Sequence, residues 1–259
     1  MKKSRSIRVK LLAWCVIPAL LIIWQLWCVV GDVPKYILPS PADVWATLTA
    51  NFGILTDNAK TTLLEAFLGL AISLLLSFAA AALMDSFGVL YRALYPILVV
   101  TQTVPTVAVA PLLVIWFGAG MAPKIILITV VCFFPITVAL LDGFKSADPE
   151  VVSLVRAMGG NRRQVFRHVK FPFALTGMFA GLKISVSYSV VGAVISEWVG
   201  GSKGLGVYMT LVKKAYSLDK MFAAIIIVIA VSLVLVESVK ILEKALTPWR
   251  RAADDKKEF

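Results

Sequence analysis

The chain has 259 residues, of which 59% are hydrophobic, with a mean hydropathy of +0.88 and a formal net charge of +11. Soluble domains carry about 45–50% apolar residues, so this composition excludes an ordinary soluble globular domain. The positive charge does not indicate a nucleic-acid partner, because the basic residues lie between apolar segments rather than along one polar face. We therefore expect contact with membrane lipid and no nucleic acid.

The apolar residues gather in runs long enough to cross a hydrocarbon core, which takes about 17–25 residues per helix. Transmembrane helices are predicted at about residues 11–30, 63–84, 94–117, 125–141, 174–198 and 221–242. The first run follows a basic N-terminus, but it is too long for a signal peptide and lacks a small-residue cleavage site. We predict an all-α membrane protein with six transmembrane helices in one transmembrane domain, residues 1–259.

Prolines lie inside two of these runs. Pro96, Pro105 and Pro111 fall in the third, and Pro135 falls in the fourth. Such residues are tolerated in lipid only where neighbouring helices satisfy the freed carbonyl groups. The third and fourth helices are therefore predicted to lie inside the bundle.

The distribution of Lys and Arg predicts the orientation. With the N-terminus inside, the cytoplasmic stretches hold eighteen of these residues and the outer stretches hold seven, while Lys183 lies within the fifth run. This excess predicts that both termini are cytoplasmic, which requires an even number of crossings. The first outer loop is long enough for an interfacial helix at about residues 41–51.

The loop at residues 142–172, predicted to be cytoplasmic, contains a short amphipathic helix. Asp148 is placed to cap it, Pro149 is its first residue, and Gly159 with Gly160 ends it. Four apolar residues at positions i, i+3, i+4 and i+7 form one stripe along this helix. They are Val151, Leu154, Val155 and Met158. A basic helical run at residues 162–169 follows. This pattern fits either a helix at the lipid headgroups or a docking element for a cytoplasmic partner.

This loop resembles the coupling segment of ABC importer permeases, the binding-protein-dependent transport family. Gly159 and Pro172 have the separation of the family pattern, and Val169 and Phe171 occupy its apolar positions. The sequence departs at residues 153–155, where Ser-Leu-Val replaces Glu-Ala-Ala. Residues 37–45, 104–118 and 196–206 also resemble the branch of this family that transports nitrate, sulfonates, taurine and thiamine precursors.

The resemblance implies the type I ABC importer permease fold, with a cytoplasmic coupling helix. The implied ATPase-coupling residues are Val151, Leu154, Val155, Met158, Gly159 and Pro172. It also implies two ABC ATPase subunits, a second copy of this chain and an extracytoplasmic solute-binding protein as partners. The implied location is the inner or plasma membrane of a prokaryote.

Two places in the membrane segments carry polar side chains. Thr101, Gln102 and Thr103 form the most polar patch of any run, and they can bind a solute or a neighbouring helix. Glu197, at the outer end of the fifth run, either lines the translocation pathway or its gate, or lies in the interface beside Trp198. Glu65 near the outer end of the second run is ambiguous in the same way.

Catalytic chemistry is not indicated. No glycine-rich phosphate loop is present, so we expect no enzyme activity and no cofactor in this chain, with ATP and Mg at the partner ATPase subunits. His168 is the single histidine, and no metal site is expected. Cys15, Cys28 and Cys132 lie in apolar stretches and are expected to be small packed residues.

The sequence is thus interpreted as the transmembrane permease subunit of an ATP-driven ABC importer, acting as a homodimer. An ion-coupled secondary transporter is the alternative, but it would show paired interrupted helices in two repeated halves. A membrane-bound enzyme lacks its catalytic residues. Residues 196–206 resemble the permeases for pyrimidine precursors of thiamine more than those for sulfonate, taurine or nitrate, and no arginine lies in the membrane runs to pair with an anion.

Overall fold

The structure is a computed structural model that describes residues 2–248, with side chains from residue 16 onward. No strand occurs between residues 2 and 248, which confirms the all-α prediction. The elements in chain order are α1 (Lys2–Val30), α2 (Pro41–Ala50), α3 (Phe52–Ser86), α4 (Gly88–Thr101), α5 (Thr106–Phe117), α6 (Met121–Lys145), α7 (Pro149–Ala157), α8 (Arg162–Val165), the π-helix η1 (Phe166–Lys170), α9 (Phe171–Gly200), α10 (Leu205–Lys214) and α11 (Leu218–Leu246).

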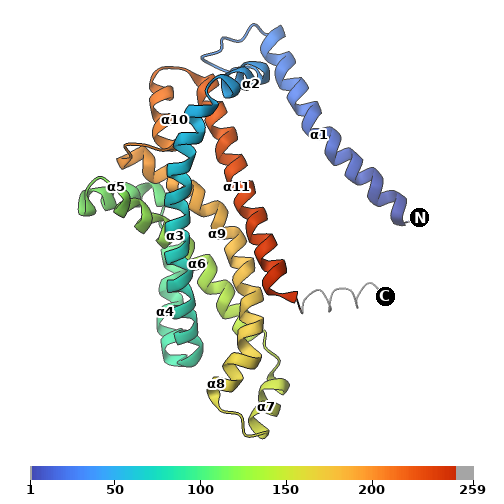
Figure 1. Cartoon of the computed structure of the whole chain (residues 1–259), viewed down its shortest axis with the longest axis vertical. Coiled ribbons are helices and arrows are strands. Elements are labelled where there is room, and N and C mark those ends of the chain that lie inside the picture. The colour runs from blue at the N-terminus through green and yellow to red at the C-terminus, as the bar shows by residue number, and fades with distance from the viewer. Residues whose placement is uncertain (1, 249–259) are drawn as a thin grey trace.

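Four long helices form the body of the molecule (Figure 1). α3, α6, α9 and α11 run along its long axis, with α2 and α10 at one end and α7 and α8 at the other. We name these the α10 end and the α7 end. α1 stands apart from the four long helices, and it contacts the rest of the chain mainly at α2.

Length and composition allow four helices to cross a membrane: α3, α6, α11 and the continuous helix Arg162–Gly200 that includes α9. α4 and α5 together form a further, bent span, and the described apolar part of α1 is the shorter stretch Val16–Val30. A multi-pass membrane fold is therefore confirmed. The count of six crossings stays a prediction.

The third predicted segment, residues 94–117, is not one helix: it contains the end of α4 and the whole of α5, whose last residue is Phe117. The chain bends by 100° between α4 and α5. α4 ends where the Thr103 N–H donates to the Val100 carbonyl at 3.0 Å, and Pro105 follows. Proline has no N–H to donate and disfavours helical geometry in the residue before it, Val104. Pro96 and Pro111 lie within α4 and α5 without such a break.

The helix expected at about residues 41–51 is present as α2. Ser40 caps it, and Ser40 and Asp43 form a reciprocal capping box. The Lys35 ammonium also lies 2.6 Å from the Asp43 carboxylate, and hydrogen bonds from Lys35 and Ser40 lower the pKa of Asp43. α3 begins at Phe52, eleven residues before the predicted start, because polar residues in its first turns obscured the helical pattern.

The core lies where α6 packs along α9. Cys132 of α6 and Val190 of α9 are fully buried, as expected for Cys132, and Cys28 is buried against the loop before α2. Cys15 lies outside the described side chains. A Cβ atom on Gly177 of α9 would overlap the Ala139 carbonyl oxygen of α6. The two helices therefore pack backbone against backbone, as small residues allow in membranes.

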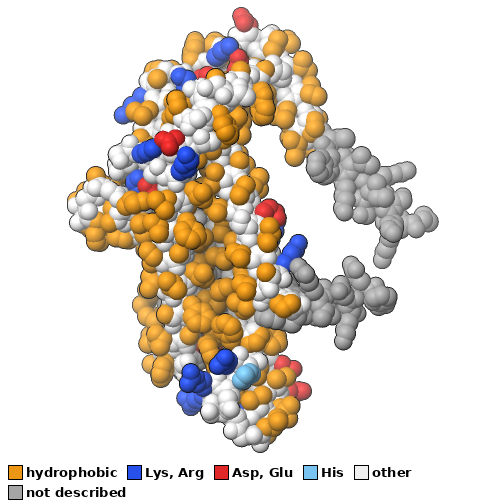
Figure 2. Space-filling view, in the orientation of Figure 1, with side chains coloured by type: hydrophobic (Ala, Val, Ile, Leu, Met, Phe, Trp, Pro, Cys, Tyr) orange, Lys and Arg blue, Asp and Glu red, His pale blue; other side chains and the backbone are white. Residues whose placement is uncertain are grey.

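The surface agrees with a lipid environment. Figure 2 shows apolar side chains over the middle of one face, with Lys and Arg gathered towards the α10 end and near α8 at the α7 end. Large exposed apolar residues on α3 and α11 include Leu75, Leu233 and Val234. Such a surface would be an aggregation hazard in water but is matched to lipid.

We predict that Gly177→Ala destabilises the protein by about 1–3 kcal/mol, the usual range for overpacking a close contact. Thermal unfolding of the detergent-purified chain measures this. Gly53→Ala is the matched control, because a Cβ at Gly53 meets no atom within 4 Å. Equal stability of the two variants would contradict the close packing of α6 on α9.

Candidate functional site

The expected coupling segment is present at the α7 end. The Asp148 side chain accepts a hydrogen bond from the Glu150 N–H at 2.8 Å, so Asp148 is the N-cap as predicted. Pro149 occupies the first turn. Gly159 has φ +84°, the left-handed conformation that a glycine adopts without steric cost. These local features confirm the predicted start and end of the helix.

The predicted apolar stripe lies on α7, and it is largely uncovered by the described chain. No residue of α7 is buried. Val151 and Leu154 are exposed, Val155 is partly buried, and Met158 is 79% exposed at the end of the helix. An exposed apolar stripe on a short helix is a surface suited to a groove on another protein.

The segment after α7 leads into α9 without a break in the helix. Asn161 and Gln164 form a reciprocal capping box at the start of α8. η1 follows, a π-helical turn of the kind often found at functional positions. The predicted run at residues 162–169 is therefore helical, and Pro172 lies in the first turn of α9.

An ion pair fastens this junction to α3. The Lys170 ammonium lies 2.7 and 2.8 Å from the two carboxylate oxygens of Asp85, near the last turn of α3. The Phe166 ring packs on Phe144 of α6 with 5.3 Å between centroids. The coupling segment is thus held against both α3 and α6.

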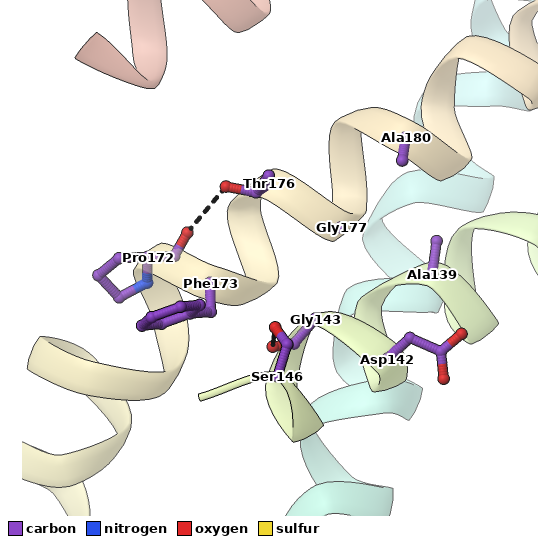
Figure 3. Close-up of a pocket in the computed structure, with 9 residues that line it drawn as sticks. All are labelled: Ala139, Asp142, Gly143, Ser146, Pro172, Phe173, Thr176, Gly177 and Ala180. Atoms are coloured by element: carbon purple, nitrogen blue, oxygen red, sulfur yellow. Dashed lines mark hydrogen bonds between the residues drawn. The ribbon is translucent and has the colours of Figure 1, made fainter. Parts of the chain in front are cut away.

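Pro172, the sixth expected coupling residue, lies apart from the stripe. It lines a cavity of about 610 Å³ between the end of α6 and the start of α9, drawn in Figure 3. The Thr176 hydroxyl donates to the Pro172 carbonyl at 3.4 Å, and Asp142 supplies the cavity's carboxylate. The structure therefore separates Pro172 from the α7 stripe.

A second cavity, of about 490 Å³, lies at the bend between α4 and α5. Thr101 and Gln102 line it, whereas Thr103 does not. The hydroxyls of Thr101 and Thr103 donate to carbonyls of their own helix, those of Leu98 and Val100. Of these three side chains, only the exposed Gln102 amide makes no hydrogen bond to a carbonyl of its own helix in the described structure.

The walls of this second cavity are mainly apolar, and every residue that lines it is uncharged. Aromatic rings are contributed by Phe134 of α6 and Tyr188 of α9, and a further hydroxyl by Thr106. A cavity of this kind suits a small solute with a flat apolar body and a few hydrogen-bonding atoms.

Glu197 does not line that cavity. Its side chain is buried, with 1% of its surface exposed. One carboxylate oxygen accepts a hydrogen bond from the Thr62 hydroxyl at 2.7 Å, and the other accepts one from the Gly206 N–H at 2.5 Å. Within this chain the carboxylate therefore joins α9 to α3 and α10.

A buried polar cluster surrounds Glu197, and most of it escaped the sequence analysis. Asn58, Thr62 and Glu65 follow one face of α3 at i, i+4 and i+7. The Lys124 ammonium of α6 lies 2.6 Å from the Glu65 carboxylate, and both side chains are nearly inaccessible. The regular spacing of polar residues in an apolar helix could have revealed this face. Lys124 could not be linked to it, because it lies 59 residues away along the chain.

The start of α10 is capped by this cluster rather than by its own residues. Its N-cap, Gly204, provides no side chain. The Gly204 N–H donates to Asn58 Oδ1 at 3.1 Å, the Leu205 N–H to Thr62 Oγ1 at 2.9 Å, and the Gly206 N–H to Glu197. A side chain at Gly204 would overlap the Glu197 carboxylate. Within residues 196–206, the Glu197 carboxylate accepts the Gly206 N–H, and the absence of a side chain at Gly204 leaves room for that carboxylate.

Comparison with known proteins agrees with these features. The family model described as "Binding-protein-dependent transport system inner membrane component" matches residues 73–248. A probable ABC transporter permease protein of Haemophilus influenzae is 38% identical over 86% of this chain and 91% of that protein. The formylaminopyrimidine transport permease protein ThiX of Halalkalibacterium halodurans is 34% identical over 90% and 93%. A putative aliphatic sulfonates transport permease protein of Bacillus subtilis is 32% identical over 91% and 87%.

The fold has a solved counterpart. A chain of the MetNI methionine ABC transporter, in an inward-facing conformation, aligns with a TM-score of 0.67 at 18% identity. The alignment covers 76% of this chain and 97% of that chain. This likeness confirms the expected fold.

We predict that Lys124→Met lowers the free energy of unfolding by about 3–5 kcal/mol, because it leaves the Glu65 carboxylate buried and unpaired. The double variant Lys124→Met with Glu65→Leu should recover most of that loss. Unfolding in detergent measures both. The exposed Lys203–Asp57 pair is the control, for which Lys203→Met should cost at most about 1 kcal/mol. Equal costs for the two lysines would contradict the buried pair.

Proposed function

Because the chain belongs to the family of binding-protein-dependent transport system inner membrane components, we propose that it moves a solute through the cavity beside Gln102 under the control of ATPase subunits bound at α7. The chain is the permease subunit of an ABC importer. ATP hydrolysis belongs to separate subunits, with ATP and Mg bound there, and a solute-binding protein delivers the cargo. Two copies of this chain form the transport unit with two ATPase subunits.

The ATPase contact is made by the stripe on α7. Its residues Val151, Leu154, Val155 and Met158 leave an apolar face for the ATPase, and Gly159 and Gly160 supply the tight turn after it. Pro172 contributes from the start of α9. At residues 153–155 this helix offers apolar Leu154 and Val155 where the family pattern has Ala-Ala, and Ser153 where it has Glu. The contact is therefore apolar rather than ionic at this point.

In this arrangement the α7 end faces the cytoplasm. The excess of Lys and Arg in the stretches predicted to be cytoplasmic, which include the loop at residues 142–172, supports this orientation. The membrane is the inner or plasma membrane of a prokaryote.

The cargo is a small heteroaromatic nutrient such as a pyrimidine precursor of thiamine. The observation that carries this assignment is the uncharged cavity, to which Phe134 and Tyr188 contribute aromatic rings and Gln102 contributes an amide. An anion such as taurine, a sulfonate or nitrate would find no cationic side chain on its walls. The relative named for formylaminopyrimidine transport is 34% identical to this chain, and the one named for aliphatic sulfonates is 32% identical. Because these identities are so similar, the assignment is based on the lining of the cavity rather than on the relatives' names.

We predict that Leu154→Asp and Gly159→Pro each reduce solute uptake at least tenfold without reducing the amount of chain in the membrane. The first places a charge in the apolar stripe, and the second cannot adopt the left-handed turn. Uptake and ATP hydrolysis are measured with the transporter reconstituted in vesicles. Arg156→Gln, at an exposed position of α7 away from the stripe, is the control and should retain uptake. Full uptake by both stripe and turn variants would refute docking through α7.

We predict that the solute-binding protein that stimulates this transporter binds a formylaminopyrimidine at micromolar concentration or below. Isothermal titration calorimetry measures it, with taurine, an alkanesulfonate and nitrate as competitors. Tight binding of any of these anions with none of the pyrimidine would overturn the cargo assignment. It would leave the importer function intact.

A further inference from the structure

We propose that Glu197 is a positioning residue that makes α10 move with α3 and α9 as one rigid body during the transport cycle. Motion imposed at α7 then reaches the opposite end of the molecule undiminished. This inference rests on the ATP-driven transport proposed above. It concerns how the two ends of the chain are linked rather than which solute is carried.

The first link is the helix that leads from the coupling segment to Glu197. Arg162–Gly200 is one continuous span of 39 residues, about 58 Å long at 1.5 Å per residue. Near its start, Lys170 pairs with Asp85 of α3. Near its far end, the Thr62 hydroxyl of α3 donates to Glu197. α3 and α9 are therefore fastened to each other at both ends, which opposes sliding or splaying between them.

The second link is the start of α10. Three successive N–H groups, those of Gly204, Leu205 and Gly206, donate to side chains of other helices. A buried N–H without a partner costs about 1–3 kcal/mol. Moving α10 away from α3 and α9 would break all three bonds at once. The backbone of this turn therefore resists separation more strongly than a contact between side chains would.

The third link is steric. Gly204, with φ +131°, leaves no room for a side chain beside the Glu197 carboxylate, and a Cβ on Gly206 would lie 2.9 Å from Glu197 Cβ. Leu205 is fully buried against Leu55 and Val194, which belong to the same apolar cluster. The turn thus packs directly against the Glu197 side chain.

A fourth contact prevents the cluster from moving separately. The buried Lys124–Glu65 pair joins α6 to α3 one turn from Thr62. α3, α6, α9 and α10 are therefore connected through buried polar bonds at the α10 end. The exposed residues of α10, such as Leu211, are displaced whenever α9 is displaced.

Cross-linking tests whether α10 moves relative to α3. Asp57 and Lys203 form an exposed ion pair with 2.7 Å between charged atoms, so Asp57→Cys and Lys203→Cys place two thiols at this boundary. The native Cys15, Cys28 and Cys132 are replaced by Ala, and a short bifunctional thiol reagent joins the pair. We expect the cross-linked transporter to keep at least half of the uptake of the same variant before cross-linking. A fall below half overturns the inference, because it shows that α10 must move against α3. Each single-cysteine variant treated with the same reagent is the control.

A second measurement tests Glu197 itself. In Glu197→Ala, both carboxylate oxygens are removed, so the Gly206 N–H and the Thr62 hydroxyl lose this acceptor. We expect uptake to fall about tenfold while ATP hydrolysis without the binding protein stays within twofold of the wild type. Glu237→Ala on the exposed face of α11 is the control. Uptake within twofold of the wild type overturns the inference. An equal loss of uptake and of ATP hydrolysis without the binding protein also overturns it, because a general defect in folding would cause both. Failure of the proposed function is distinguishable, because the wild-type chain itself would then show no ATP-dependent uptake.

Discussion

The structure depends on one constraint: a backbone N–H or carbonyl that leaves a helix in lipid must find its partner within the protein, because the hydrocarbon offers none. Two interruptions show two solutions. Between α9 and α10 the free N–H groups are satisfied by Asn58, Thr62 and Glu197, so this turn is fixed. Between α4 and α5 the chain bends by 100° beside a cavity lined by Gln102. The first interruption is fixed by these bonds, and the second leaves a cavity, which is the proposed place for a solute.

Close packing of the two backbones determines the contact between α6 and α9. Glycines at 143 and 177 let the two backbones touch, and the apolar residues around Cys132 complete the core. Ion pairs also hold α3 to these helices, through Glu65 with Lys124 and, in its last turn, through Asp85 with Lys170, and we infer that the bundle is stiff between the coupling segment and α10. A permease that is driven from one side of the membrane needs such stiffness, since a compliant helix would absorb the motion.

Local patterns were sufficient for features that are set within a few residues. The cap at Asp148, the turn at Gly159 and the stripe on α7 were all predicted, because each depends on neighbours one or two turns away. The bend at Pro105 was missed, since proline is compatible with both a kinked helix and a break, as Pro96 within α4 illustrates. The role expected for Glu197 in a pathway remains a proposal that its internal bonds to Thr62 and Gly206 do not favour.

The sequence by itself determined the membrane class, the helical fold and the position of the coupling segment, because hydropathy, periodicity and capping act locally along the chain. The family followed from four short stretches in order. Only the tertiary structure decided which polar residues meet. Glu65 finds Lys124 59 residues away, and Thr62 finds Glu197 135 residues away. Such pairings depend on which helix faces lie together, and many alternatives satisfy the same apolar pattern. The side chains that the sequence left ambiguous were therefore the ones whose partners lie on other helices.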